Sequence, residues 1–311
     1  MNKKLKTLFM GTSKFAVPIL KGLIDNNYPI IGVFCQSDKP VGRKKIITPP
    51  PIKDLAIISG IYIFQPPNLQ SPEIIKKIKE LNPELIVVSA YGHILPEDVL
   101  NIPEYGCINI HASILPKYRG AAPIQWAIVN GELETGVTIM LMDKGIDTGD
   151  ILNQKSIKIE FEDNFETLSN KLSLLGKDLL LETLPLWIQK KIIPQKQNHN
   201  MATPAPIIKK EDGKIDWSKS ALEIYNKLRG FYPWPGIYTE FENKRLKILK
   251  AIPLQENSTS TKYGQIVNIT KEYIDVNTGD KILRLLEVQP EGKKVMKAGD
   301  FSRGYKVTCF N

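Results

Sequence analysis

The sequence predicts an α/β fold: a doubly wound, mostly parallel sheet of the Rossmann-like type, followed by a small C-terminal β-barrel of the OB-like type. The first part of this prediction depends on strands that are apolar along their whole length and on helical patterns that alternate with them. Such strands are buried on both faces by helices. The second part depends on short strands, separated by turn signals, near the C-terminus.

The elements of the first domain follow in order from these patterns. The clearest buried strand is ELIVVSA, residues 84–90. The other expected strands are 5–11, 30–36, 61–64, 107–111 and a segment that begins at 136. The expected helices are 15–24, 52–60, 72–80, an apolar helix that ends near 128, and a long amphipathic helix over 164–190.

A linker is expected after the long helix. Residues 190–208 hold three prolines, three lysines and no acid, a composition typical of an extended connector. Beyond it, a hairpin is expected around Glu242–Lys244 and a second turn at Thr278–Asp280. We therefore expect three parts: residues 1–189, the linker 190–208, and residues 209–311.

Composition excludes several classes of protein. In the chain of 311 residues, no apolar run approaches the roughly 20 residues that are needed to cross a bilayer. The apolar run near the start of the sequence is too short for a signal peptide. Its three scattered cysteines predict neither a disulfide framework nor a zinc site, so a cytoplasmic location is expected. The net charge of +9 permits an anionic partner such as nucleic acid. Residues 207–311 carry most of that excess, with 19 Lys+Arg and 13 Asp+Glu.

Two polar side chains stand at the end of an otherwise apolar strand. Asn109 and His111 are two residues apart and therefore point to the same face. Ligands of open parallel sheets bind beyond the carboxyl ends of the strands, where His111 would lie. An imidazole can transfer protons near neutral pH, and an amide N–H can stabilise an oxyanion. The pair suits attack on a carbonyl carbon, although two capping polar residues would give the same pattern.

An acidic, glycine-rich loop supplies candidates to orient this histidine. It holds Asp143, Asp147 and Asp150, among which periodicity does not choose, and acids and glycines also form ordinary turns. His93 could border the same crevice, whereas His199 lies in the linker and is expected to be solvated. The histidines and acids show no ligand spacing, so no metal is expected.

The motifs INIHASILPKYRGAAPIQWAI (108–128) and TGVTIMLMDKGIDTGDIL (135–152) resemble those of the folate-dependent formyltransferases. The resemblance is nearly end to end and is strongest to one branch, the methionyl-tRNA formyltransferases, through GTSKFAVPIL, the basic insertion and FYPWPG. Departures are small: Ala112 and Ile114 stand where glycine and leucine are commoner, and Ser13-Lys14 replaces the usual Pro-Asp.

The resemblance implies transfer of a formyl group from 10-formyltetrahydrofolate to the α-amino group of methionyl initiator tRNA, by a monomer without metal. It implies that Asn109 and His111 stabilise the oxyanion and that Asp147 orients His111 and a water. The implied folate-binding residues are Tyr91, Ile94, Leu95, Ser113, Ile114, Leu115 and Pro116.

The segment 37–51 is much longer than the 2–6 residues of an ordinary strand-to-helix connection, and such loops are functional or disordered. By resemblance it enters the tRNA acceptor stem, with Arg43 as the principal residue beside Lys39, Lys44 and Lys45. In the C-terminal domain, which the resemblance makes tRNA-binding, a basic hairpin could follow phosphates, and GFYPWPG is expected to be a buried aromatic corner. The basic residues of that hairpin are Lys244, Arg245, Lys247 and Lys250.

Two alternatives remain open. The first is a folate-dependent formyltransferase acting on a small amine, either glycinamide ribonucleotide or an amino sugar, which would need neither the insertion nor the basic C-terminal domain. The second is a non-catalytic RNA-binding protein with a decayed transferase fold, against which the complete set Asn109, His111 and Asp147 argues.

Overall fold

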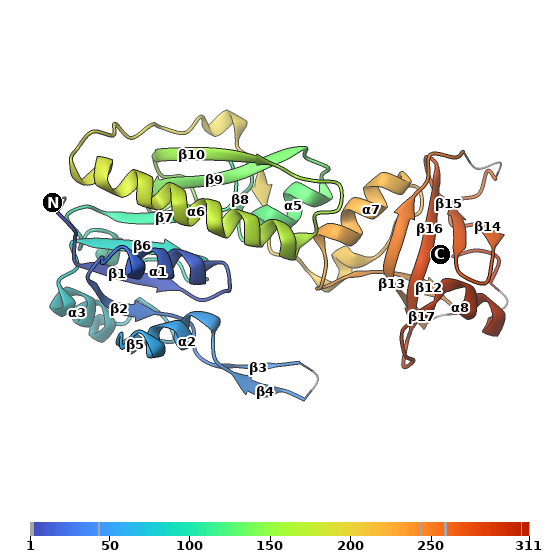
Figure 1. Ribbon diagram of the computed structural model, residues 1–311, viewed down its shortest axis with the longest axis horizontal. Helices are drawn as coiled ribbons and strands as arrows, with labels where there is room; N and C mark the ends of the chain where they lie inside the picture. The colour runs from blue at the N-terminus through green and yellow to red at the C-terminus, as the bar shows by residue number, and fades with distance from the viewer. Residues whose placement is uncertain (1–2, 43, 243, 258–259, 306, 311) are drawn as a thin grey trace. The chain divides into compact units, whose positions relative to one another are not determined.

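The computed structural model describes residues 3–42, 44–242, 244–257, 260–305 and 307–310 (Figure 1). The chain forms two compact units, each made of three segments. The first unit comprises Met1–Pro123, Glu134–Lys158 and Ser169–Pro206. The second unit comprises Ile124–Leu133, Ile159–Leu168 and Ile207–Asn311.

A seven-stranded sheet forms the centre of the first unit, with the strand order β10-β9-β7-β6-β1-β2-β5. The five strands from β7 to β5 are parallel, while β9 runs antiparallel to β7 and β10 antiparallel to β9. This confirms the predicted doubly wound, mostly parallel sheet. The strands are β1 (Thr7–Gly11), β2 (Ile30–Phe34), β5 (Ile63–Phe64), β6 (Leu85–Ser89), β7 (Cys107–His111), β9 (Glu134–Leu141) and β10 (Ile151–Lys158).

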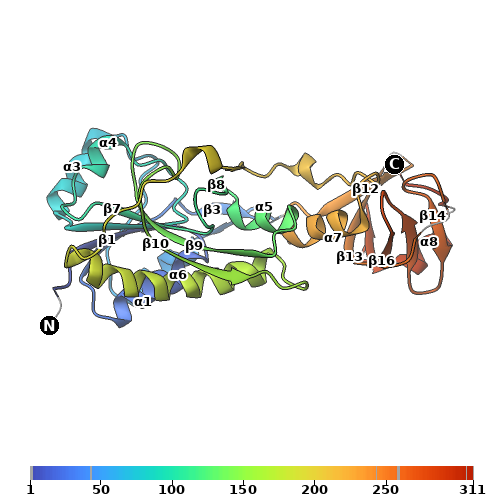
Figure 2. The ribbon, with the colours of Figure 1, turned by 90° about the horizontal axis from the view of Figure 1, so that it is seen from above.

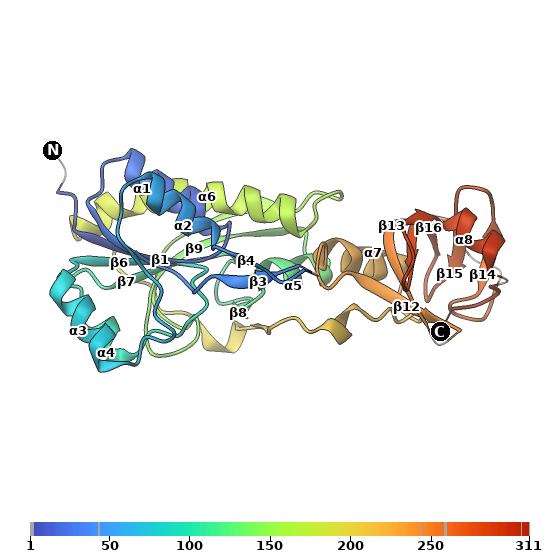
Figure 3. The same ribbon diagram turned by 90° about the horizontal axis from the view of Figure 1, so that it is seen from below.

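Helices cover both faces of this sheet. Figures 2 and 3 show α1 and α6 on one face, and α3 and α4 on the other. Gly176 lets α6 approach the sheet closely, because a Cβ there would lie 2.9 Å from Cγ2 of Ile110. The helices of the first unit are α1 (Ala16–Asp25), α2 (Pro51–Ile58), α3 (Pro72–Leu81), α4 (Glu97–Leu100) and most of α6 (Phe165–Ile188), whereas α5 (Pro123–Val129) lies almost wholly in the second unit. Within the described ranges, no helix has the length and apolar character needed to span a membrane.

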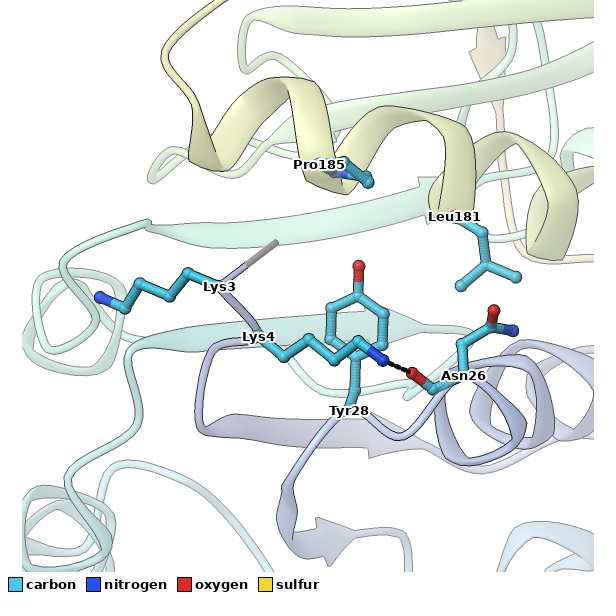
Figure 4. Close-up of a pocket in the computed structure, with 6 residues that line it drawn as sticks. All are labelled: Lys3, Lys4, Asn26, Tyr28, Leu181 and Pro185. Atoms are coloured by element: carbon cyan, nitrogen blue, oxygen red, sulfur yellow. Dashed lines mark hydrogen bonds between the residues drawn. The ribbon is translucent and has the colours of Figure 1, made fainter. Parts of the chain in front are cut away.

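A shallow cavity of about 140 Å³ lies at the amino ends of the strands, between the start of β1 and the last turns of α6 (Figure 4). The two lysines that border it already have partners: Lys3 forms an ion pair with Glu84, and Lys4 donates to the carbonyl of Asn26. This cavity is at the opposite edge of the sheet from the strand end where Asn109 and His111 are found. It therefore offers no free charge to a ligand.

The segment expected to be an extended linker is instead packed against the first unit. Residues Pro204–Ala205 form β11, which pairs in parallel with β8 (Arg119–Gly120). Gly120 has a φ of +127°, and a Cβ there would lie 2.5 Å from the carbonyl oxygen of Ala205, so this pairing requires glycine. A short 3₁₀ turn, η1 (His199–Met201), precedes β11. The composition of the segment did not indicate these contacts, because they are made by single residues without a period.

The second unit contains an antiparallel sheet with the order β12-β13-β16-β15-β14, and β17 pairs with β16. The predicted hairpin and the predicted second turn are both confirmed, between β12 and β13 and between β15 and β16. The elements are α7 (Ala221–Gly230), β12 (Ile237–Phe241), β13 (Lys244–Pro253), β14 (Ile266–Ile269), β15 (Ile274–Asn277), β16 (Ile282–Pro290), β17 (Met296–Lys297) and α8 (Ala298–Gly304).

Helix α7 joins the C-terminal sheet to the two earlier segments of the second unit. The buried guanidinium of Arg229 donates to the carbonyls of Glu160 (3.2 Å) and Asp163 (2.7 Å) and to Oδ1 of Asn226 (2.6 Å). Phe231 packs edge-on against Trp126 of α5, with ring centroids 5.8 Å apart. The second unit is therefore assembled from residues far apart in the sequence.

The prediction of a buried aromatic corner at GFYPWPG is wrong for two of its three aromatic residues. Phe231 is fully buried, but 44% of Tyr232 and 59% of Trp234 is exposed. Phe231 takes the inward position against α5, and the alternating prolines leave the other two rings outside.

Candidate active site

Three side chains from distant parts of the first unit meet at the carboxyl end of β7. Asn109 and His111 lie on β7, which pairs with β6 on one side and with β9 on the other. Asp147 lies on the loop between β9 and β10. Its Oδ1 is 3.4 Å from Nδ2 of Asn109 and 3.5 Å from Nδ1 of His111. The structure thus brings together an amide, an imidazole and a carboxylate at the edge where open α/β sheets bind ligands.

The imidazole of His111 is held between a backbone carbonyl and this carboxylate. Nε2 lies 2.9 Å from the carbonyl oxygen of Tyr118, which can only accept, so Nε2 carries a proton. Nδ1 then faces Asp147, to which it donates only when the ring is doubly protonated. His111 can therefore exchange a proton at Nδ1 without losing the bond that orients its ring.

Asp147 differs from the other two acids of its loop. Its φ of +52° is left-handed, a conformation that costs a non-glycine residue about 1–3 kcal/mol and persists only where the surroundings hold it. Its Oδ2 accepts a hydrogen bond from the backbone N–H of Gly120 at 2.9 Å. Asp143, in contrast, accepts from Gly145 and Thr148 within the loop. The structure therefore identifies Asp147 as the acid beside Asn109 and His111, a choice that periodicity could not make.

The other two histidines have partners of their own. His93 is half-buried, with its ring 5.2 Å from that of Tyr91. His199 is exposed, as expected, but its Nδ1 accepts from the guanidinium of Arg119 at 3.1 Å. Across the described ranges, no group of three or more His, Cys, Asp or Glu side chains has the arrangement of a metal site.

The turn after β7 contains four of the residues expected to bind folate. Ser113 is buried, and its hydroxyl donates to the carbonyl of Lys117 at 2.6 Å. Leu115 is also buried, whereas Ile114 and Pro116 keep part of their surface exposed. The turn therefore offers apolar surface at two of its four positions.

Two residues that the sequence did not indicate hold this turn. The hydroxyl of Thr138 donates to the carbonyl of Ser113 (2.7 Å) and accepts from the N–H of Leu115 (3.1 Å). Nε2 of Gln154 donates to the Thr138 hydroxyl (2.8 Å) and to the carbonyl of Leu115 (2.9 Å). Thr138 lies on β9 and Gln154 on the polar edge strand β10, where alternation gives no sign of this role.

Replacing Thr138 with valine keeps the shape of the side chain but leaves the buried N–H of Leu115 without its partner. We expect the free energy of unfolding to fall by about 1–3 kcal/mol and folate affinity to weaken, since the turn loses its support. Denaturant unfolding and folate titration measure the two effects. Thr138→Ser should restore both, and Thr261→Val, on an exposed threonine, should change neither. Unchanged folate affinity in Thr138→Val would contradict this role.

The other segment expected to bind folate follows β6. Ile94 is 73% exposed, while Tyr91 and Leu95 are buried in the apolar core beneath it. Burial raises the pKa of the Tyr91 phenol. The backbone carbonyl of Tyr91 accepts from Thr12 (2.8 Å) and Gln36 (3.2 Å), so Tyr91 anchors the segment and Ile94 presents its surface.

The basic insertion forms a hairpin of two short strands, β3 (Lys39–Val41) and β4 (Ile46–Thr48), which extends from the sheet in Figure 1. Arg43 lies outside the described residues. The base of the hairpin is braced by Lys53, which forms an ion pair with Asp38 at 2.9 Å and also donates to Gln65. The exposed side chains of the hairpin include basic and apolar ones: Lys39, Val41, Lys44, Lys45, Ile46 and Ile47.

The predicted basic residues of the second unit divide into two groups. Lys244, Lys247 and Lys250 are exposed on β13. The Arg245 guanidinium instead lies 4.3 Å from the centre of the Tyr238 ring and is half-buried. The three lysines are therefore free to meet an anion, whereas Arg245 is partly engaged by an aromatic ring.

Comparison with known proteins places these features in context. The family model described as "Formyl transferase" matches residues 3–184, and "Formyl transferase, C-terminal domain" matches residues 207–306. The methionyl-tRNA formyltransferase of Caldanaerobacter subterraneus subsp. tengcongensis is 49% identical over 304 residues, covering 97% of this chain and 98% of that protein. The Bacillus subtilis protein of the same name is 46% identical over 303 residues, covering 97% and 95%.

Solved structures share the fold at low sequence identity. WlaRD, a sugar 3N-formyl transferase solved with dTDP and 5-N-formyl-THF, has a TM-score of 0.68 and 22% identity, covering 94% of this chain and all of that one. HypX from Aquifex aeolicus, solved with tetrahydrofolic acid, has a TM-score of 0.65 and 16% identity, covering 96% of this chain and 47% of that one.

Proposed function

Since the chain belongs to the formyl transferase family, we propose that it transfers the formyl group of 10-formyltetrahydrofolate to the α-amino group of methionyl initiator tRNA. The observation that carries this proposal is the cluster of Asn109, His111 and Asp147 at the carboxyl edge of the sheet. The chain also matches relatives named methionyl-tRNA formyltransferase over nearly its full length, through both domains. The product would be N-formylmethionyl-tRNA for translation initiation.

The chemistry needs no covalent intermediate on the protein. The α-amino group has a pKa near 8, so a useful fraction is neutral at pH 7 and attacks the formyl carbon directly. As the new C–N bond forms, the carbonyl electrons move to oxygen; the amide of Asn109 donates to that oxyanion, and the ring of His111 stabilises it through its positive charge once it has taken up a proton. The bond to N10 of folate then breaks. His111, oriented by Asp147, relays the proton lost by the amine to N10, with a water held by Asp147.

Folate is proposed to bind beside this cluster, between the two segments that follow β6 and β7. Ile94, Ile114 and Pro116 present the surface for it, because they are the exposed or half-exposed members of the set. The buried members support these segments from below. They are Tyr91, Leu95, Ser113 and Leu115.

The proposed tRNA contacts come from both parts of the chain. Lys39, Lys44 and Lys45 of the hairpin, with Arg43, would meet the acceptor stem, and lysines of β13 would follow phosphates. In this proposal residues 1–189 are catalytic, 190–208 link, and 209–311 bind tRNA. The protein would act as a monomer in the cytoplasm. The proposed contacts on β13 are Lys244, Arg245 and Lys247.

The decisive experiment compares four acceptors under the same conditions. With 10-formyltetrahydrofolate as donor, charged initiator tRNA should be formylated efficiently, and charged elongator methionine tRNA, glycinamide ribonucleotide and an amino-sugar nucleotide poorly or not at all. Efficient formylation of a small amine would establish the first alternative. Folate binding with no turnover on any acceptor would favour the non-catalytic RNA-binding protein.

A further inference from the structure

Residues 195–205, here called the strap, are bound along the first unit at several points. The backbone of Gln195 exchanges two hydrogen bonds of 2.8 Å with that of Ile151. Further along, the backbone N–H of Tyr118 donates to the hydroxyl of Thr203, and that of Arg119 to the carbonyl of Thr203, both at 2.9 Å. The strap therefore contacts two segments. One is the turn that follows His111, and the other is the start of β10, which follows the loop that carries Asp147.

Gln197 is the one residue of the strap whose side chain reaches between these two regions. It is only 6% exposed. Its Nε2 donates to the carbonyls of Asp147 (2.9 Å) and Gly149 (2.7 Å). Its Oε1 accepts from Nε (3.1 Å) and Nη2 (2.6 Å) of Arg119. Both N–H donors and both oxygen lone pairs of the amide are therefore used.

The orientation of this amide is determined by its partners. A guanidinium only donates and a backbone carbonyl only accepts, so the oxygen must face Arg119 and the nitrogen must face the loop. No other side chain of similar size carries two donors and an acceptor on one rigid group. Neither glutamate nor methionine can therefore make both halves of the contact.

These bonds act on the two backbone positions that hold the catalytic groups. On one side Gln197 holds the carbonyl of Asp147, the residue with left-handed φ. On the other it holds Arg119, which lies between Tyr118, whose carbonyl binds His111, and Gly120, whose N–H binds the Asp147 carboxylate. The amide of Gln197 thus fixes the distance between the Tyr118–Gly120 turn and the backbone of Asp147.

We propose that Gln197 is a positioning residue for formyl transfer, which acts by holding Asp147 and the Tyr118–Gly120 turn in the geometry that His111 requires. The inference rests on the proposed function, since it assigns Asp147 a part in the reaction. It extends the functional site to a segment whose composition is that of a linker.

The test uses the full-length protein with Gln197→Met, which removes all four hydrogen bonds at similar volume, and Gln197→Glu, which keeps only the contact with Arg119. Both should lower kcat for formylation of charged initiator tRNA by about 10–100-fold, because small displacements of reacting groups have effects of this size. KM for folate and for tRNA should stay within about twofold. The matched control is Gln195→Ala, since the side chain of Gln195 is exposed and only its backbone is used.

A double-mutant cycle separates positioning from a general structural effect. In an Asp147→Ala background the backbone contact with Gln197 remains, but the carboxylate that this contact positions is gone, so Gln197→Glu should lower kcat by less than about twofold. A loss as large as in the wild-type background would overturn the proposal, as would a Gln197→Glu enzyme equal to Gln195→Ala. A wild-type protein without formyl transfer would instead refute the proposed function, so the two failures are distinguishable.

Discussion

Replacing Asn109 with alanine is expected to lower kcat by about 10²–10³, because its amide supplies one donor to the developing oxyanion. His111→Ala should lose most of the turnover as well, since it removes the only imidazole in the cluster. Both side chains lie at a strand end beside the proposed folate turn, not beneath it. Folate affinity should therefore survive better than turnover in both variants.

Rapid-quench measurement of single-turnover formyl transfer checks this prediction without interference from product release. Equilibrium titration with folate gives the binding control, and Asn101→Ala, on an exposed asparagine at the end of α4, gives the matched control variant. Near wild-type turnover in either Asn109→Ala or His111→Ala would remove that residue from the mechanism.

The second large effect concerns the basic hairpin and its dependence on salt. Binding through phosphates releases counterions, so the logarithm of tRNA affinity should fall linearly with the logarithm of salt concentration, by about 0.9 per duplex phosphate contact. If Lys44 and Lys45 each meet a phosphate, replacing both with alanine should reduce that slope by about 1.8. Affinity at low salt should fall as well.

The matched control is the double replacement of Lys76 and Lys77, two adjacent exposed lysines on α3 that change the net charge equally. Filter binding of charged initiator tRNA across a salt series gives both slopes, and folate affinity should not change in either variant. Equal slopes for the hairpin variant and for the control would count against the hairpin as the reader of the acceptor stem and would reopen the small-amine alternative.

Much of the candidate active site was predictable from elementary rules. The period of two along a strand places Asn109 and His111 on one face, and the carboxyl-edge rule places that face at the ligand crevice. Asp147 was not predictable in this way, because three acids share one turn and any of them could satisfy turn chemistry. Its selection depends on a left-handed backbone and a bond to the N–H of Gly120, which only tertiary structure supplies.

Other features of the structure correspond to no periodic pattern in the sequence. Strand β10 lies at the edge of the sheet and is mostly polar, so it lacks the apolar pattern of its neighbours. The bonds of Thr138, Gln154 and Gln197 join single side chains to backbone groups far away in the chain, which no local rule detects. Helix α7 could have been found, because Ser220 and Glu223 form a capping box at the start of a segment whose apolar residues recur at helical spacing.

The three-segment construction of the second unit has a consequence for its synthesis. Arg229 bonds to carbonyls 66 and 69 residues earlier in the chain. At a ribosomal rate of roughly 5–20 residues per second, Asp163 emerges about 3–13 s before the helix that covers it. Throughout that delay the nascent chain carries an unfinished apolar surface around α5, which α7 later closes at Gly230, where a Cβ would lie 2.7 Å from Val129. A ribosome that stalls before α7 is complete therefore leaves a polypeptide with a formed first unit and a surface open to chaperones and proteases.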